Sequence, residues 1–146
     1  MSDKQMEVYK ILQSSQDKYV YFEMAATMTA IGFAITQTKT LKLSTTQVLL
    51  GVSVFFWGLS FLCGLLNRTY YNSYLGINYN ILKIEHGEHP DITCDHDISD
   101  VTEGLRKRMN KKSAKGSGLA NLQTLLLCLG AISYIGWHIY EMYLRI

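Results

Sequence analysis

A run of nineteen residues without a charged side chain constrains the fold of this sequence more than any other feature. The run extends from Val48 to Leu66 and reads VLLGVSVFFWGLSFLCGLL. About 20 apolar residues in helical conformation cross the hydrocarbon core of a lipid bilayer. A buried helix of this length in a soluble protein normally keeps a polar face, and this run has none. We therefore predict a transmembrane helix over residues 47–66.

Two further apolar stretches flank this run along the chain. Residues 119–143 contain the uncharged sequence LLLCLGAISYIGW, and Trp137 and Tyr143 lie toward the end of the stretch, as is typical of a headgroup interface. Residues 19–37 are rich in Ala and Thr and contain Glu23. A helix that lies on the headgroups needs a charged face, which this stretch lacks apart from Glu23. We predict a transmembrane helix in both stretches.

The charged residues lie mostly outside these stretches. The mean hydropathy of the whole chain, +0.04, therefore does not reveal the apolar stretches. A length of 146 residues corresponds to one domain. The net charge of +2 gives no overall field of one sign, and we expect no nucleic-acid partner. The sequence predicts an all-α integral membrane protein that forms a single membrane domain over residues 1–146. It has three transmembrane helices, cytosolic helical extensions, and a polar cytosolic loop between helices 2 and 3.

The distribution of Lys and Arg predicts the orientation of the three helices. Of the 14 Lys and Arg residues, eleven fall in residues 1–18 and 67–118, and three fall on the other side of the predicted spans. An odd number of spans places these two segments on the same side, which we expect to be the cytosol. The prediction is a multi-pass protein of a cell inner membrane, with its N-terminus in the cytosol and its C-terminus outside.

The polar segments are predicted to be largely helical. Residues 1–18 form a cytosolic amphipathic helix that continues into the first span without a helix breaker. The second span continues past residue 67 until Gly87 and Pro90 end it.

The helix that leads into the third span has two predicted boundaries. Asp100 and Glu103 resemble the capping arrangement of a helix N-terminus. The sequence SAKGSG at residues 113–118 has the composition of a flexible joint before the span.

Small residues recur at helical spacing in each predicted span. Such residues let helix backbones approach closely in lipid, either within one chain or between copies, and we favour a homo-oligomer. The candidate packing residues are Ala26, Ala30, Ala34, Gly51, Gly58, Ser60, Gly64, Gly130, Ser133 and Gly136.

Glu23 is the one acidic residue within the first apolar stretch. An ionisable group inside a membrane span is costly to bury and is therefore a functional candidate. The alternative is that Glu23 lies one turn from the cytosolic interface and reaches back to water, toward Lys18 or Arg68.

The polar loop at residues 85–100 concentrates the side chains that bind transition metals. The candidate ligands are His86, His89, Cys94 and His96. Their spacing matches no known motif, and a solvated acidic loop without a cofactor is the alternative that we favour.

A run of basic residues precedes the third span. We expect these residues to bind anionic lipid headgroups, since no aromatic residues are interleaved with them as in many nucleic-acid interfaces. The candidates are Arg106, Lys107, Arg108, Lys111 and Lys112.

No phosphate-binding loop, nucleophile elbow or catalytic triad is evident in the sequence, and we expect no enzymatic activity. The leading hypothesis is a small oligomeric protein that acts on the membrane as a channel, pore or membrane-perturbing effector, for example in bacterial antiphage defence. Candidate pore-lining residues are Thr27, Thr29, Thr36, Ser53, Ser60, Thr124 and Ser133. The alternatives are a non-catalytic accessory subunit, bound to a cytosolic or membrane protein partner, and a metal-responsive transporter component.

Overall fold

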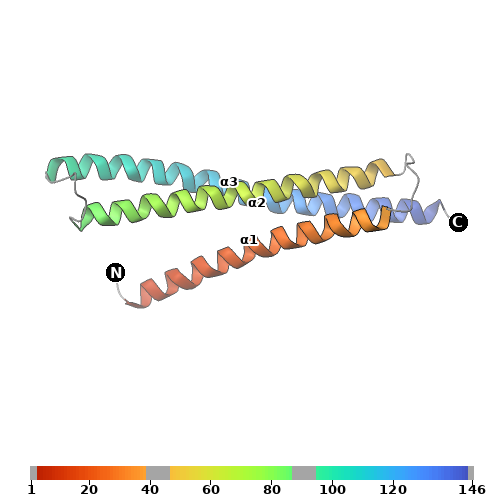
Figure 1. The fold of residues 1–146 in the computed structure, drawn as a ribbon, viewed down its shortest axis with the longest axis horizontal. Coiled ribbons are helices and arrows are strands. Elements are labelled where there is room, and N and C mark those ends of the chain that lie inside the picture. The colour runs from red at the N-terminus through yellow and green to blue at the C-terminus, as the bar shows by residue number, and fades with distance from the viewer. Residues whose placement is uncertain (1–2, 39–46, 87–94, 145–146) are drawn as a thin grey trace. The chain divides into compact units, whose positions relative to one another are not determined.

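The computed structural model describes residues 3–38, 47–86 and 95–144. Within these ranges the chain forms three helices and no strand (Figure 1). Helix α1 comprises Asp3–Thr38, α2 comprises Gln47–Glu85, and α3 comprises Asp95–Tyr143. The prediction of an all-α chain with helical extensions beyond the apolar stretches is confirmed.

The residues divide into two compact units. The first unit contains residues 1–64 and 121–146, and we call its helical part the apolar bundle. The second unit contains residues 65–120, and we call its two helical segments the hairpin. Because α2 and α3 each contribute residues to both units, the two units are described separately below.

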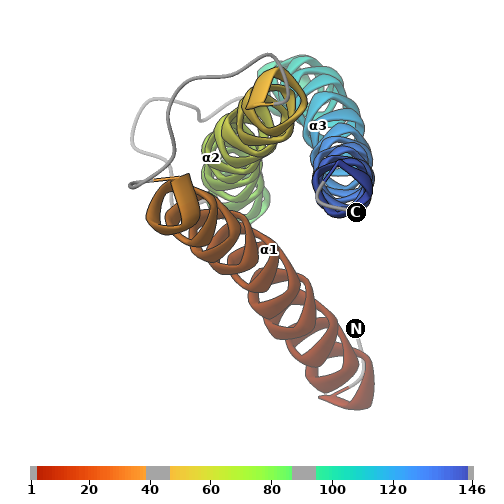
Figure 2. The ribbon, with the colours of Figure 1, turned by 90° about the vertical axis from the view of Figure 1, so that its right-hand side faces the viewer.

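Three helices pack together in the apolar bundle (Figure 2). Ala34, Leu50, Trp57 and Trp137 form its buried core, and Tyr134 packs against them. The Trp57 and Tyr134 rings lie 5.7 Å apart between centroids, within the 4.5–7 Å range that aromatic pairs favour. An alanine of α1 therefore meets the large aromatic residues of α2 and α3 at the centre of the bundle.

Side-chain contacts set the directions of the helices in the apolar bundle. Trp57 and Ser60 of α2 bond to the carbonyl groups of Leu127 and Gln123 respectively, so α2 runs antiparallel to α3. Between α1 and α3, Glu23 bonds to Thr124 and Gln37 bonds to Tyr134, so these two helices run parallel.

Of the described helices, α2 and α3 are long and apolar enough to cross a membrane. Only 33% of the most apolar 18-residue stretch of α2 is buried within the protein, and only 17% of that of α3. A core helix of a soluble protein would be mostly buried instead. The third span, predicted over residues 19–37 within α1, stays a prediction.

Two predicted features before the third span are wrong. Residues 113–118 form part of the continuous helix α3 and are not a flexible joint. The helix begins at Asp95, so Asp100 and Glu103 lie inside it and do not cap it. Glycine costs a helix only about 1 kcal/mol per residue relative to alanine, a cost that packing of the helix against α2 can offset.

Other predicted helix boundaries agree with the structure. Helix α2 ends at Glu85, just before Gly87, as predicted. Helix α1 runs without interruption from Asp3 through the first apolar stretch. Ile11, on the predicted apolar face of residues 1–18, has an exposed side chain.

The hairpin pairs the later part of α2 with the earlier part of α3 (Figure 1). Ile81, Ile84 and Thr102 are buried in it. Gly116 is also buried: a Cβ atom at this position would lie 3.4 Å from Oδ1 of Asn67 and 3.8 Å from Cβ of Tyr70. The glycine therefore lies where the two helices of the hairpin are in contact, within a segment that is helical throughout.

Candidate functional site

Polar side chains are buried at the centre of the apolar bundle. Among the described residues of this unit they are Glu23, Thr27, Ser53, Ser60 and Gln123. The hydroxyl of Thr27 donates to the carbonyl of Glu23 at 2.6 Å, and that of Ser53 donates to the carbonyl of Leu49 at 3.0 Å. These two hydroxyls are therefore satisfied within their own helices.

Two other donors join α2 to α3. The hydroxyl of Ser60 donates to the carbonyl of Gln123 at 2.8 Å, and Nε1 of Trp57 donates to the carbonyl of Leu127 at 3.3 Å. The two donors are three residues apart on α2 and the two acceptors four apart on α3, so both pairs fall on the facing sides of the helices. Each carbonyl accepts this second bond with its remaining lone pair.

Glu23 joins α1 to α3. Its side chain is only 4% exposed, and Oε1 accepts a hydrogen bond of 2.8 Å from Oγ1 of Thr124. Lys18 is exposed and forms no ion pair with this carboxylate. The alternative in which Glu23 reaches back to water through Lys18 therefore does not describe this arrangement.

Gln123 lies at the same level of the bundle. Its side chain is fully buried, and neither its amide oxygen nor its amide nitrogen has a hydrogen-bond partner in the described part of the chain. A Cβ atom on Gly64 would lie 2.9 Å from Nε2 of Gln123 and 2.9 Å from Cγ of Met24. All three helices thus meet around Gln123, whose unpaired amide costs about 1–3 kcal/mol.

The predicted packing residues separate into two groups. Ala34, Gly64 and Gly130 lie against other helices of the bundle, and a Cβ on Gly130 would fall 2.5 Å from Cδ1 and Nε1 of Trp57. In contrast, no atom lies within 4 Å of the Cβ positions of Gly51 and Gly58. Packing within the chain therefore explains why the residues of the first group are small. It does not explain Gly51 and Gly58, whose Cβ positions contact no other helix.

The other predicted packing residues do not distinguish packing within one chain from packing between copies. A Cβ on Gly136 would be in ordinary contact with Cδ2 of Leu49, at 3.7 Å. The remaining half-buried small residues are Ala26, Ala30 and Ser133.

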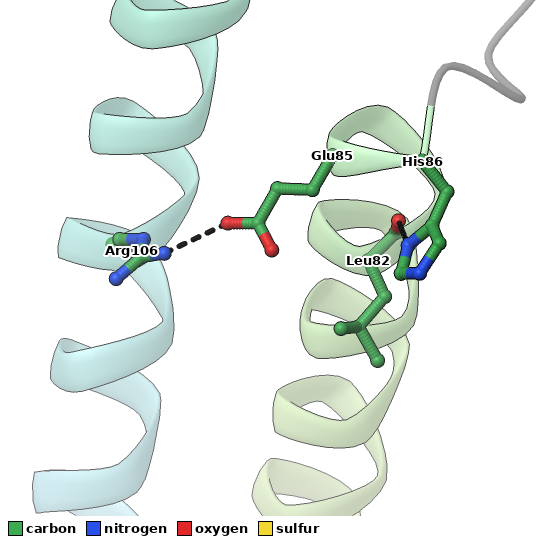
Figure 3. A network of polar contacts seen from close by, with 4 residues as sticks. All are labelled: Leu82, Glu85, His86 and Arg106. Carbon is green, nitrogen blue, oxygen red and sulfur yellow. Dashed lines mark hydrogen bonds and ion pairs between the residues drawn. The ribbon is translucent and has the colours of Figure 1, made fainter. Parts of the chain in front are cut away.

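The predicted headgroup-binding run divides in the hairpin. Nη2 of Arg106 donates to Oε1 of Glu85 at 2.8 Å, as Figure 3 shows. Nζ of Lys107 lies 2.7 Å from Oε1 of Glu103, one helical turn earlier. The hydrogen bond from Lys107 and its positive charge lower the pKa of the Glu103 carboxyl, and the same contact raises the pKa of Lys107. These two basic residues are therefore neutralised locally.

The later residues of the basic run are arranged differently. Arg108 and Lys111 are exposed. Nζ of Lys112 lies 5.0 Å from the centre of the Tyr70 ring, and Nζ of Lys115 lies 5.9 Å from the same ring. The sequence interpretation missed Tyr70 and Lys115, because only the pairing of α2 with α3 brings them together.

One of the four predicted metal ligands has a described side chain. Nδ1 of His86 lies 2.7 Å from the carbonyl oxygen of Leu82 (Figure 3), and this contact requires a proton on Nδ1. The side chains of His89, Cys94 and His96 lie outside the described residues. Among the described residues, no group of three or more His, Cys, Asp and Glu side chains gathers into a metal site. The metal site stays a prediction.

No protein-family model, curated protein or solved structure matches this chain significantly. The geometry described above is therefore the basis for the functional argument.

Proposed function

We propose that the chain is a three-span integral membrane protein that acts on the membrane as an oligomeric channel, pore or membrane-perturbing effector. The observation that carries the membrane assignment is the inverted polarity of the apolar bundle. Glu23 and Gln123 are buried in it, whereas Phe55 and Ile132 are 63% and 66% exposed. A water-soluble bundle has the opposite arrangement.

The energetic argument favours lipid around the bundle. Each large apolar side chain that remains in water forgoes about 1.5–3 kcal/mol relative to its burial. Exposed examples occur on all three helices, including Phe33, Leu62 and Ile139. The hydrocarbon core of a bilayer removes this cost and also makes internal pairing of polar groups favourable.

The proposal includes α1 as the third span. Between residues 19 and 38, Glu23 is the only ionisable group other than tyrosine, and its carboxylate is turned into the bundle. Large apolar side chains of this segment are exposed, including those of Phe22, Phe33 and Ile35. Three spans also agree with the distribution of Lys and Arg, which favours an inner-membrane protein with residues 1–18 and 67–118 in the cytosol.

The buried hydroxyls bear on how such a protein would conduct. Thr27, Ser53 and Ser60 are fully buried and bonded to backbone carbonyls, so they line no water-filled surface in this arrangement. We interpret the bundle as a resting state, in which conduction requires several copies. The open face of α2 at Gly51 and Gly58 is the proposed contact between copies, because glycines allow close approach of backbones in lipid.

Membrane potential in a bacterial host tests this function. Induced expression of the wild-type chain is expected to depolarise the cells. The double variant Gly51→Leu/Gly58→Leu fills the open face and is expected to abolish depolarisation at equal levels of inserted protein. Gly32→Leu is the matched control, because Gly32 lies on α1 with no atom within 4 Å of its Cβ position, and it should still depolarise. An unchanged potential with inserted wild-type protein would exclude a constitutive pore.

A second candidate function is that of an accessory subunit in a larger membrane complex. The internal bonding of the buried hydroxyls favours it, since helices whose buried hydroxyls are already paired are suited to docking as a preformed element. An unchanged potential, together with a defined partner cross-linked to α2 and purified with the chain, would favour this function over the first.

A further inference from the structure

Two lysines of α3 converge on a single aromatic ring of α2 in the hairpin. Lys112 and Lys115 place their ammonium groups 5.0 and 5.9 Å from the centre of the Tyr70 ring. The lysines are three residues apart and therefore share one face of α3. Both distances lie within the range of a cation–π interaction.

Gly116 lies beside this convergence, where α3 contacts α2. It is buried, and its Cβ position lies 3.4 Å from Oδ1 of Asn67 and 3.8 Å from Cβ of Tyr70. The α3 backbone consequently comes close to α2 beside the residue that carries the ring. Lys112 and Lys115 both precede Gly116 on α3 and reach over the Tyr70 ring.

Lys112, Lys115 and Tyr70 form a cluster whose positive charge is not balanced by the described residues. Arg106 and Lys107 each have a carboxylate partner, whereas Lys112 and Lys115 have none in the described part of the hairpin. Two ammonium groups that share one ring repel each other. An anion between them would relieve this repulsion, and each ammonium keeps N–H donors for it.

The position of the cluster along the helices indicates the source of the anion. Tyr70 lies four residues after Leu66, where the second apolar stretch ends, and Lys115 lies four residues before Leu119, where the third begins. At about 1.5 Å per residue, both are roughly 6 Å along the helix from the apolar boundary. Lipid phosphates lie at this depth, where tyrosine rings are also enriched.

We propose that Lys112, Lys115 and Tyr70 form a binding site for the phosphate group of an anionic phospholipid in the cytosolic leaflet. The two ammonium groups bind the phosphate, and the ring holds the lysines in place. This proposal rests on the proposed membrane insertion. It replaces the broad basic run of Arg106 to Lys112 with a site that both helices of the hairpin build.

The test is lipid retention by the full-length protein, reconstituted in nanodiscs of mixed phosphatidylglycerol and phosphatidylcholine and examined by native mass spectrometry. The wild-type chain should retain phosphatidylglycerol in preference to phosphatidylcholine. Lys112→Gln/Lys115→Gln should lower this preference roughly tenfold. Arg108→Gln/Lys111→Gln is the matched control, with the same spacing and charge loss but no cation–π contact to the described residues, and should stay within about twofold of wild type.

Each outcome is informative. Equal losses of lipid preference in the two double variants would show general electrostatic attraction. No loss in either variant would show that these basic residues do not attract the lipid, and each of these two results would overturn the site. Displacement of the lipid by millimolar inorganic phosphate would indicate a free anion as ligand and also overturn the lipid assignment. Circular dichroism confirms that the variants are folded. Flotation with vesicles precedes the assay, so failed insertion counts against the proposed function, whereas insertion without lipid preference counts against this site alone.

Discussion

At Gly130 the backbone of α3 meets the indole ring of Trp57 with no room for a side chain. The Cβ of an alanine would fall 2.5 Å from two ring atoms, and the ring cannot turn freely because its Nε1 donates to the carbonyl of Leu127. Gly130→Ala is therefore expected to lower the free energy of unfolding by about 1–3 kcal/mol, despite the better helix propensity of alanine. Thermal unfolding in detergent, followed by circular dichroism, measures this change.

Gly32 supplies the control for this prediction. It lies in the same apolar bundle, but no atom is within 4 Å of its Cβ position. Gly32→Ala should leave stability unchanged or raise it by up to about 1 kcal/mol. Equal destabilisation by both substitutions would contradict the described packing.

The pair of Glu103 and Lys107 gives a prediction about pH. The lysine lowers the pKa of the Glu103 carboxyl below its ordinary value of 4.5, so the pair stabilises the helix above that value and the effect is lost as pH falls through the lowered pKa. The pKa of Lys107 is raised above 10.5, so at the alkaline end the effect is lost as pH rises through that raised pKa. Carbon-detected NMR titration should show a Glu103 midpoint below 4.5.

Lys107→Gln tests the cause of this shift. The substitution removes both the hydrogen bond and the charge, so the Glu103 midpoint should return toward its ordinary value. An unmoved midpoint would show that Lys107 does not hold the carboxyl in solution.

At the residue scale, the sequence identified individual groups but not their partners. Glu23 was recognisable as the acidic residue of an apolar stretch, whereas its partner Thr124 is 101 residues away. Gln123 is a polar residue near the start of the third apolar stretch, and only the packing of three helices buries it completely. Periodicity identifies the face of a helix, but it does not specify which face of another helix lies opposite.

At the scale of elements, Gly116 lies where α3 contacts α2 in the hairpin. Gly116→Leu should separate the helices of the hairpin, because its side chain would extend into Asn67 and Tyr70. We expect loss of the hairpin contacts and faster amide hydrogen exchange at residues 113–118. Hydrogen–deuterium exchange with mass spectrometry measures both effects.

Gly118→Leu is the companion substitution. No atom lies within 4 Å of the Cβ position of Gly118, so the leucine should be tolerated and exchange should stay slow. Fast exchange at residues 113–118 in the wild-type chain would instead support the flexible joint that the composition predicted.

The prediction of elements succeeded where the signal was local and strong. The uncharged run of Val48–Leu66 and the stop at Gly87 are properties of neighbouring residues, and both appear in α2. The sequence SAKGSG misled because its glycines read as a joint when considered alone. Their effect on the helix depends on contacts between Gly116 and residues of α2, which are remote along the chain.

At the scale of the whole molecule, the proposed membrane orientation has a direct test. Alkaline phosphatase fused after residue 146 should be active in a bacterial host, because this enzyme folds outside the cytosol. Green fluorescent protein at the same position should stay dark when exported through the same route. The opposite result, a fluorescent and phosphatase-negative C-terminus, would contradict the proposed orientation. If the N-terminus is shown to be cytosolic as well, two crossings by α2 and α3 would account for it and α1 would be removed from the set of spans.

The hydrogen bond between Glu23 and Thr124 has a consequence for synthesis. It joins α1 to α3 across 101 residues, so Glu23 leaves the ribosome well before its partner. At about 5–20 residues per second, α1 waits roughly 5–20 s before its partner is translated. During that time the Glu23 carboxyl group has no hydrogen-bond donor to pair with in lipid, where an unpaired acidic residue costs about 3 kcal/mol. In the proposed membrane setting, α1 therefore remains at the translocon or the interface until α3 arrives, and a chain truncated before Thr124 would leave its first helix outside the bilayer.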